Sequence, residues 1–312
     1  MPNSLPPYEA GNALARASFL ECLEALRGAS LHIDWLAGNN GDRLIRMGLA
    51  RLLEQASAAI VESPQEADVI VLSGGGAMNE FWGGGLAVLE SYRRRFPAKP
   101  LHVAPSSFHV SRERFLQICD LGDAPLVLYC REERSYDWLR RLQPPEHVDV
   151  RLAQDLALEL QGGDFIREQL PKRSRDHFLI AMRGDREGNA GIYEKARAPW
   201  LPPLIRRPLS RVRTRLIARR SRRVIDAIGR AMGVPHDVPR VYCDVSVGAE
   251  FDEFVRLIRT AHTIVTDRLH CGILAYMLNK HAVLRPGSYH KVQGVFEYSL
   301  SGPGSRVTMW AD

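Results

Sequence analysis

Cysteine is scarce in this sequence, and the cysteines that occur show no paired spacing. The 312-residue chain has only five, an odd number scattered from one end to the other. This pattern indicates neither a disulfide framework nor a structural zinc site, and it favours a reducing compartment. We therefore expect a cytoplasmic protein whose site holds no metal. The cysteines are Cys22, Cys119, Cys130, Cys243 and Cys271.

Long apolar runs are also missing. No stretch of 18 residues is continuously apolar, which excludes a membrane-spanning helix. Met1 to Ala10 carries proline and an acid where a secretory signal has a basic start and an apolar core. With 45% hydrophobic and 25% charged residues, the chain has the composition of a soluble globular protein, long enough for two domains.

Acidic residues are absent from one long segment. Residues 197–223 contain ten arginines and no Asp or Glu, within what we expect to be a basic insertion at residues 195–223. Three interpretations stay open: docking on an anionic membrane surface, binding of nucleic acid, and a solvated insertion without a ligand. We favour the membrane over nucleic acid, which predicts a protein held peripherally at the inner membrane face.

Short apolar runs alternate with helical patterns along the chain. Continuously apolar runs suit strands that are buried on both faces of a parallel sheet, and apolar residues spaced three or four apart indicate helices. The alternation predicts an α/β fold with doubly wound sheets. We expect strands at 32–36, 67–73, 101–103, 126–130, 148–152, 178–181, 240–243, 263–266 and 282–284. We expect helices at 13–26, 43–55, 133–142, 221–232, 251–261 and 268–278.

The region 161–176 divides this alternation in two. It combines Gly162-Gly163 with Pro171-Lys172-Arg173, which is typical of a linker. We predict two Rossmann-like domains, 1–160 and 177–312, with a cleft between them. Ligands of open α/β sheets bind beyond the carboxyl ends of the strands, and most candidate site residues fall at such ends.

The segment Asp267-Arg268-Leu269-His270 stands between a predicted strand and a predicted helix. Asp267 is suited to cap that helix, whose free N–H groups favour an anion. Arg268 offers a planar fork for a carboxylate or phosphate, and His270 titrates near neutrality and can move a proton. The alternative is a capped helix with an exposed arginine and a half-buried histidine.

Five further segments fall in a fixed order with this one and together resemble the polysaccharide pyruvyltransferase family. They are Asn39-Asn40-Gly41-Asp42, Leu72 to Gly76 with its glycine run, Arg131 to Ser135, Asp155-Leu156-Ala157, and Ser288-Tyr289-His290-Lys291. The resemblance spans about residues 33 to 300. The sequence departs from the family at Asn279-Lys280-His281, where a Gly-x-Pro is usual; asparagine can still end the helix there.

The resemblance implies a GT-B-like arrangement of the two domains and an activity. The family transfers pyruvate from phosphoenolpyruvate to two hydroxyls of a sugar, forming a ketal. It implies that Arg268, Leu269 and His270 contact phosphoenolpyruvate, with His270 catalytic and Arg183 as a second cation. Phosphoenolpyruvate is then the donor substrate and no cofactor is needed. The acceptor is an exopolysaccharide or its repeat unit linked to a polyprenyl diphosphate.

The remaining segments keep two interpretations each. Gly41-Asp42, next to Asn40, is a turn and helix cap or part of an acceptor site. Gly74, Gly75 and Gly76 let a loop approach the sheet or offer N–H groups to a ligand. Arg131 and Ser135 are ordinary at a strand end and helix start, or line the cleft. Lys291 is a solvated charge or part of the anion site. His102, His109 and His290 show no partner and are expected to be structural or solvated.

Two other functions compete with pyruvyl transfer. A GT-B glycosyltransferase using a nucleotide sugar would share the fold and the basic cleft, but it usually needs an acid for the ribose. Asp267 is the near candidate for that acid, and it has the position of a helix cap. A non-catalytic module that binds polysaccharide or nucleic acid would not need His270.

Overall fold

The computed structural model describes residues 18–81, 83–172, 174–183, 219 and 222–310. Apart from three positions, the arginine run 197–223 lies outside the described residues, and so does its expected contact with a membrane. In the described part of the chain, no helix has both the length and the apolar composition to cross a bilayer.

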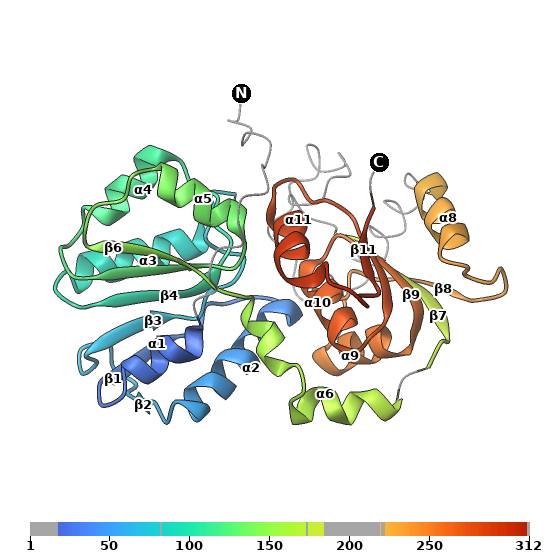
Figure 1. Cartoon of the computed structure of the whole chain (residues 1–312), viewed down its shortest axis with the longest axis horizontal. Coiled ribbons are helices and arrows are strands. Elements are labelled where there is room, and N and C mark those ends of the chain that lie inside the picture. The colour runs from blue at the N-terminus through green and yellow to red at the C-terminus, as the bar shows by residue number, and fades with distance from the viewer. Residues whose placement is uncertain (1–17, 82, 173, 184–218, 220–221, 311–312) are drawn as a thin grey trace.

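The first half of the chain forms a six-stranded parallel sheet (Figure 1). Its strand order is β2-β1-β3-β4-β5-β6. Strand β2 therefore lies on one side of β1, and β3 to β6 follow in order on the other side. The strands are β1 (Ser30–Asp34), β2 (Ala59–Ile60), β3 (Val69–Leu72), β4 (Leu101–Ser106), β5 (Leu126–Cys130) and β6 (Val148–Leu152).

The second half forms a five-stranded parallel sheet whose topology repeats that of the first. Its order is β11-β10-β9-β7-β8, so its second strand again lies beside its first, and its third lies on the other side. The point where such an order reverses is where ligands bind. The strands are β7 (His177–Ala181), β8 (Arg240–Tyr242), β9 (Ala261–Thr266), β10 (His281–Leu284) and β11 (Val307–Met309).

Helices cover both faces of each sheet, which is why the strands are apolar on both sides. In the first half, α1 (Phe19–Ala25) and α2 (Asn40–Gln55) pack on one face. The other face is covered by α3 (Gly84–Arg95), α4 (Arg112–Cys119) and α5 (Glu133–Arg141). In the second half, α8 (Arg222–Ala231) covers one face. The opposite face is covered by α9 (Phe251–Thr260), α10 (Leu269–Met277) and α11 (Lys291–Val295). The expected fold class, two doubly wound α/β sheets, is confirmed.

The two halves share part of their core. Ile45 and Leu49 of α2 pack in the core of the first sheet, whereas Leu44 of the same helix packs with the core of the second. The 3-10 helix η1 (Leu156–Leu160) likewise contributes Ala157 and Leu158 to that second core. Between η1 and β7 the chain forms the helix α6 (Asp164–Gln169) and the 3-10 turn η2 (Leu170–Lys172) (Figure 1).

The starts of α2 and α10 differ from the sequence predictions in an informative way. Helix α2 begins at Asn40 and not at Arg43, because Asn39 caps it: Asn39 Oδ1 accepts the N–H of Gly41, and Asp42 Oδ2 accepts the N–H of Asn39. The predicted cap at Asp267 is wrong. Arg268 is the N-cap residue of α10, and Asp267 turns toward β7.

Candidate active site between the two sheets

A cavity of about 530 Å³ lies at the carboxyl ends of both sheets. Its walls are the segments that follow β1, β3 and β5 in the first half and β7, β8, β9 and β10 in the second. These include the two places where the strand orders reverse, between β1 and β3 and between β7 and β9. The loop ends at both reversal points therefore line one cavity, at the position where such sheets bind ligands.

Arg131, directly after β5, places an unused donor at this cavity. Its side chain is buried; Nη1 donates to Asp155 Oδ2 at 2.7 Å and Nε donates to Ser107 Oγ at 2.9 Å. Its Nη2 has no hydrogen-bond partner among the described residues. A buried guanidinium N–H without a partner is costly, so this group is suited to bind an anion in the cavity.

Lys291 brings a second cation to the same place from the other half of the chain. A Cβ atom added at Gly76 would lie 3.4 Å from Lys291 Nζ and 3.5 Å from Arg131 Nη2. The two cationic groups therefore converge over Gly76, whose missing side chain leaves the space beside them open. Lys291 is buried at the start of α11, and its Nζ also lies 5.1 Å from the centre of the Tyr289 ring.

His270 stands beside these cations and shares a carboxylate with one of them. Its Nε2 lies 3.4 Å from Asp155 Oδ2, the oxygen that accepts from Arg131. Burial opposes ionisation of Asp155, but the charges of His270 and Arg131 outweigh burial and hold the pKa of this carboxyl below its usual range. The ionised Asp155 therefore lies within ion-pair distance of the imidazole.

The glycines of the first half make room for these groups. A Cβ atom at Gly41 would lie 2.6 Å from His270 Nδ1, so any larger residue there would collide with the imidazole. Gly74 has a φ of 77°, and a Cβ there would lie 2.5 Å from the carbonyl oxygen of Ala104. Asn40 links the halves, since its Nδ2 donates to the carbonyl oxygens of Val245 and Ala249.

Arg268 lines the cavity, but a buried carboxylate occupies much of its guanidinium. Its Nε and Nη2 donate to the two oxygens of Asp244 at 2.8 and 2.5 Å. Such a fork-to-carboxylate pair fixes the arginine's position. Arg268 therefore holds the wall of the site together as well as adding charge to it.

Asp267 positions Arg183. Its Oδ1 accepts the backbone N–H of Arg183 at 2.6 Å, which ties the end of β7 to the end of β9. Burial raises the pKa of Asp267 to about 6, against the opposing effects of that N–H and of the nearby arginines. The carboxyl group of Asp267 thus binds a backbone N–H.

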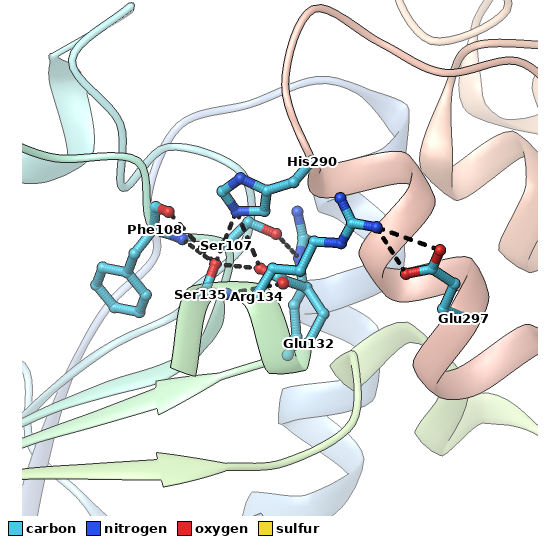
Figure 2. Close-up of polar contacts among 8 residues, drawn as sticks. Ser107, Phe108, Glu132, Arg134, Ser135, His290 and Glu297 are labelled. Atoms are coloured by element: carbon cyan, nitrogen blue, oxygen red, sulfur yellow. Dashed lines mark hydrogen bonds and ion pairs between the residues drawn. The ribbon is translucent and has the colours of Figure 1, made fainter. Parts of the chain in front are cut away.

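A polar cluster outside the cavity joins α5 to the segment that carries Lys291 (Figure 2). His290 Nε2 lies 3.2 Å from Ser135 Oγ and 3.4 Å from Glu132 Oε1, and all three residues are buried. On the exposed side, Arg134 pairs with Glu297 at 3.2 Å. The cluster fixes His290, the neighbour of Lys291, against the first half of the chain.

Most of the residues singled out from the sequence meet at the cavity. Its described lining includes Asp42, Gly76, Arg131, Arg183, Arg268, Leu269, His270 and Lys291. Asn40, Gly41, Gly74, Gly75 and Ser135 lie outside that lining, and their role in acceptor binding stays a prediction.

Sequence reasoning missed the carboxylates behind the site. Asp155, Asp244 and Glu132 hold Arg131, Arg268 and His290 in place. Asp155 carried a signal, because it belongs to one of the ordered segments; Asp244 stands after β8 with nothing beside it to mark its partner. No group of three or more His, Cys, Asp or Glu side chains suited to a metal occurs among the described residues.

The sequence that builds this basic, histidine-containing cavity is similar to that of a known protein family. The sequence profile described as polysaccharide pyruvyl transferase matches residues 15–285. The chain belongs to that family. Its members are transferases that place pyruvyl groups on polysaccharides, and the expectation drawn from the ordered motifs is thereby confirmed at the level of the family.

Structure comparison finds similar solved structures at low sequence identity, and the first of the two below shares the fold. A functionally uncharacterized protein from Klebsiella pneumoniae is 18% identical with a TM-score of 0.61, over 94% of this chain and 97% of its own. A UDP-GlcNAc 2-epimerase from Methanocaldococcus jannaschii is 12% identical with a TM-score of 0.37, over 89% of this chain and 72% of its own. No curated protein sequence matches significantly.

Proposed function

We propose that this pyruvyl transferase takes its pyruvyl group from phosphoenolpyruvate and forms a ketal with two hydroxyls of one sugar. One observation supports the proposal most directly: Arg131 Nη2 and Lys291 Nζ converge over Gly76, in the cavity that His270 also lines. Phosphoenolpyruvate carries a carboxylate and a phosphate, and arginine forks suit both groups. The donor binds between Arg131 and Lys291 on one side and Arg183 on the other.

His270 moves the proton in this proposal. It donates a proton to the methylene carbon while a sugar hydroxyl attacks the neighbouring carbon, and the proton that this hydroxyl loses restores the imidazolium. The second hydroxyl then attacks the same carbon, the bond to the phosphate oxygen breaks, and phosphate leaves with the second hydroxyl proton. Asp155 stabilises the imidazolium before the first transfer. Arg268 and the backbone of Leu269 contribute charge and an N–H at the start of α10.

The acceptor in the proposal is an exopolysaccharide repeat unit carried on a polyprenyl diphosphate. The arginine-rich composition of residues 197–223 supports it, since such a segment attracts anionic surfaces. A comparison of lipid-linked and free oligosaccharides as acceptors tests this point, and equal rates for both would count against a carrier-bound substrate.

The decisive experiment incubates the protein with phosphoenolpyruvate and a panel of oligosaccharides. It measures phosphate release and the gain of a pyruvyl group by mass spectrometry. We expect His270→Gln to lower kcat by a factor of roughly 10² or more, the usual contribution of a general acid. His236→Gln, at an exposed position outside the cavity, is the matched control and should keep full activity.

Two results would overturn the proposal. A fully active His270→Gln would remove the proton-transfer role from this residue. Turnover of a nucleotide sugar in place of phosphoenolpyruvate would favour a glycosyltransferase with the same fold.

A further inference from the structure

A second cavity, of about 360 Å³, lies at the opposite end of the second sheet. Its lining includes His262 and His281, at the amino ends of β9 and β10, whereas the first cavity lies at the carboxyl ends. From His262 to Thr266 the strand β9 advances about 13 Å at 3.3 Å per residue. The two cavities are therefore separate and connected by one strand.

This second cavity is lined by positive charge. Besides the two histidines, Arg175, Lys280 and Arg306 line it, and none of its described lining residues is Asp or Glu. The two arginines are exposed at its rim, while Lys280 is buried and donates from Nζ to the carbonyl oxygen of Ser174 at 2.7 Å. Cations gathered in a concave site repel one another and attract a counter-ion.

The positive charges of the cavity, together with burial, lower the pKa values of both histidines. Burial, together with Arg306, Arg175, His262 and Lys280, lowers the pKa of His281. Burial, with Arg175 and Lys280, lowers the pKa of His262. An anion in the cavity would reverse the repulsion and let both imidazoles add to the charge that holds it.

The charge of this cavity comes partly from the place where the sequence departs from its family. The family's Gly-x-Pro is replaced here by Asn279-Lys280-His281, and all three residues line the cavity. Asn279 adopts a φ of 53°, the left-handed conformation that glycine would otherwise supply. The departure thus keeps the turn and adds an amide, a lysine and a histidine to the site.

We propose that this cavity binds a small anion bearing a phosphate or diphosphate group. Its volume lies at the lower end of the range for small-molecule sites, and two arginines at the rim offer forks for phosphate oxygens. The phosphate group belongs either to a soluble metabolite or to the headgroup of a lipid. The proposal does not depend on the identity of the pyruvyl donor.

The test uses inorganic pyrophosphate as the probe and the ring protons of His262 and His281 as reporters in NMR spectra. We expect saturable shifts of both signals. The double variant Arg175→Gln/Arg306→Gln should weaken the affinity read from these signals roughly tenfold or more. Arg112→Gln removes one exposed charge from α4 in the other half, and it should leave the affinity unchanged.

Sedimentation with vesicles containing an anionic phospholipid distinguishes the two sources of the phosphate. Vesicle binding that the double variant loses would assign the cavity to a lipid headgroup, and pyrophosphate binding alone would assign it to a soluble compound. Absence of saturable shifts in both histidine signals, or equal affinities in the double variant and Arg112→Gln, would overturn the proposal.

Discussion

A side chain at position 41 has no room, because His270 occupies the space beside this glycine. In an exposed helix, replacing glycine by alanine stabilises the fold by roughly 0.5–1 kcal/mol. In Gly41→Ala the new methyl group must displace the imidazole or the start of α2. We therefore expect a loss of pyruvyl transfer of tenfold or more, with the fold retained in circular dichroism spectra.

The matched control for this variant is Gly229→Ala in α8. A Cβ atom there would lie 3.4 Å from the ring of Phe178, close to ordinary contact, and Gly229 does not line the cavity. It should keep full activity. Equal activities for the two variants would show that the space beside Gly41 does not position His270.

Asp267 makes a prediction about pH and stability. Its folded pKa of about 6 is above the unfolded value of about 3.9, so its contribution favours folding at low pH. That contribution is fully present below about pH 4 and is lost as the pH rises through about 6. The loss amounts to about 3 kcal/mol on this reasoning.

Asp267→Asn should remove this dependence, because the amide oxygen still accepts the N–H of Arg183 but carries no charge. Urea unfolding of the two proteins at about pH 4 and about pH 7 measures the difference. The variant should gain stability relative to the parent as the pH rises. The exposed Asp123→Asn is the control. If the free energies of unfolding of Asp267→Asn and the parent differed by the same amount at both pH values, the expected pH dependence would be contradicted.

Which residues meet at the site was largely predictable from the sequence, but their partners were not. Arg131, Arg268 and His270 stand at strand ends, and parallel sheets bring strand ends together. That Asp244 occupies the fork of Arg268 depends on two loops 24 residues apart. Spacing along the chain carries no trace of such a pairing. The contact of Asp267 with the N–H of Arg183 joins two loops in the same way, which is why Asp267 was wrongly assigned to the helix start.

Helix α11 depends on a buried contact with the other half of the chain. His290, which precedes its first residue Lys291, lies against Glu132 and Ser135 (Figure 2). In His290→Ala this contact is lost and Lys291 is no longer fixed. We expect KM for phosphoenolpyruvate to rise roughly tenfold, with a smaller change in kcat.

The neighbouring pair Arg134–Glu297 provides the control for this variant. It joins α5 to η4 (Phe296–Leu300), which directly follows α11, but both side chains are partly exposed, and exposed ion pairs contribute little. Glu297→Gln should therefore leave KM nearly unchanged. A similar rise in both variants would mean that the buried cluster has no special role in placing Lys291.

Elements with strong patterns were predicted, and those with weak patterns were not. Strands β5 and β6 have the expected bounds, since their apolar residues are bounded by turn residues. Helix α3 was missed because it begins with Gly84-Gly85 and ends in three arginines, so its apolar face is short. Strands β2 and β11 contain only two and three residues and have no period to detect.

At the scale of the whole molecule, an anion in the first cavity should stabilise the fold. Arg131 and Lys291 come from different halves, and a ligand between them binds only when both halves are folded. We expect phosphoenolpyruvate to raise Tm in a calorimetric scan, by an amount that grows with its concentration. Arg131→Gln should reduce this shift in Tm, and Arg112→Gln should not. An unchanged shift in Arg131→Gln would show that Arg131 does not bind phosphoenolpyruvate.

The shared core also bears on how the protein can be dissected. Leu44 belongs to the first half of the sequence but completes the core of the second sheet, as do Ala157 and Leu158. A fragment that begins at residue 161 would expose the apolar surface that these three residues cover. Expressed alone, such a fragment is expected to aggregate, whereas co-expression with residues 1–160 should restore a soluble complex.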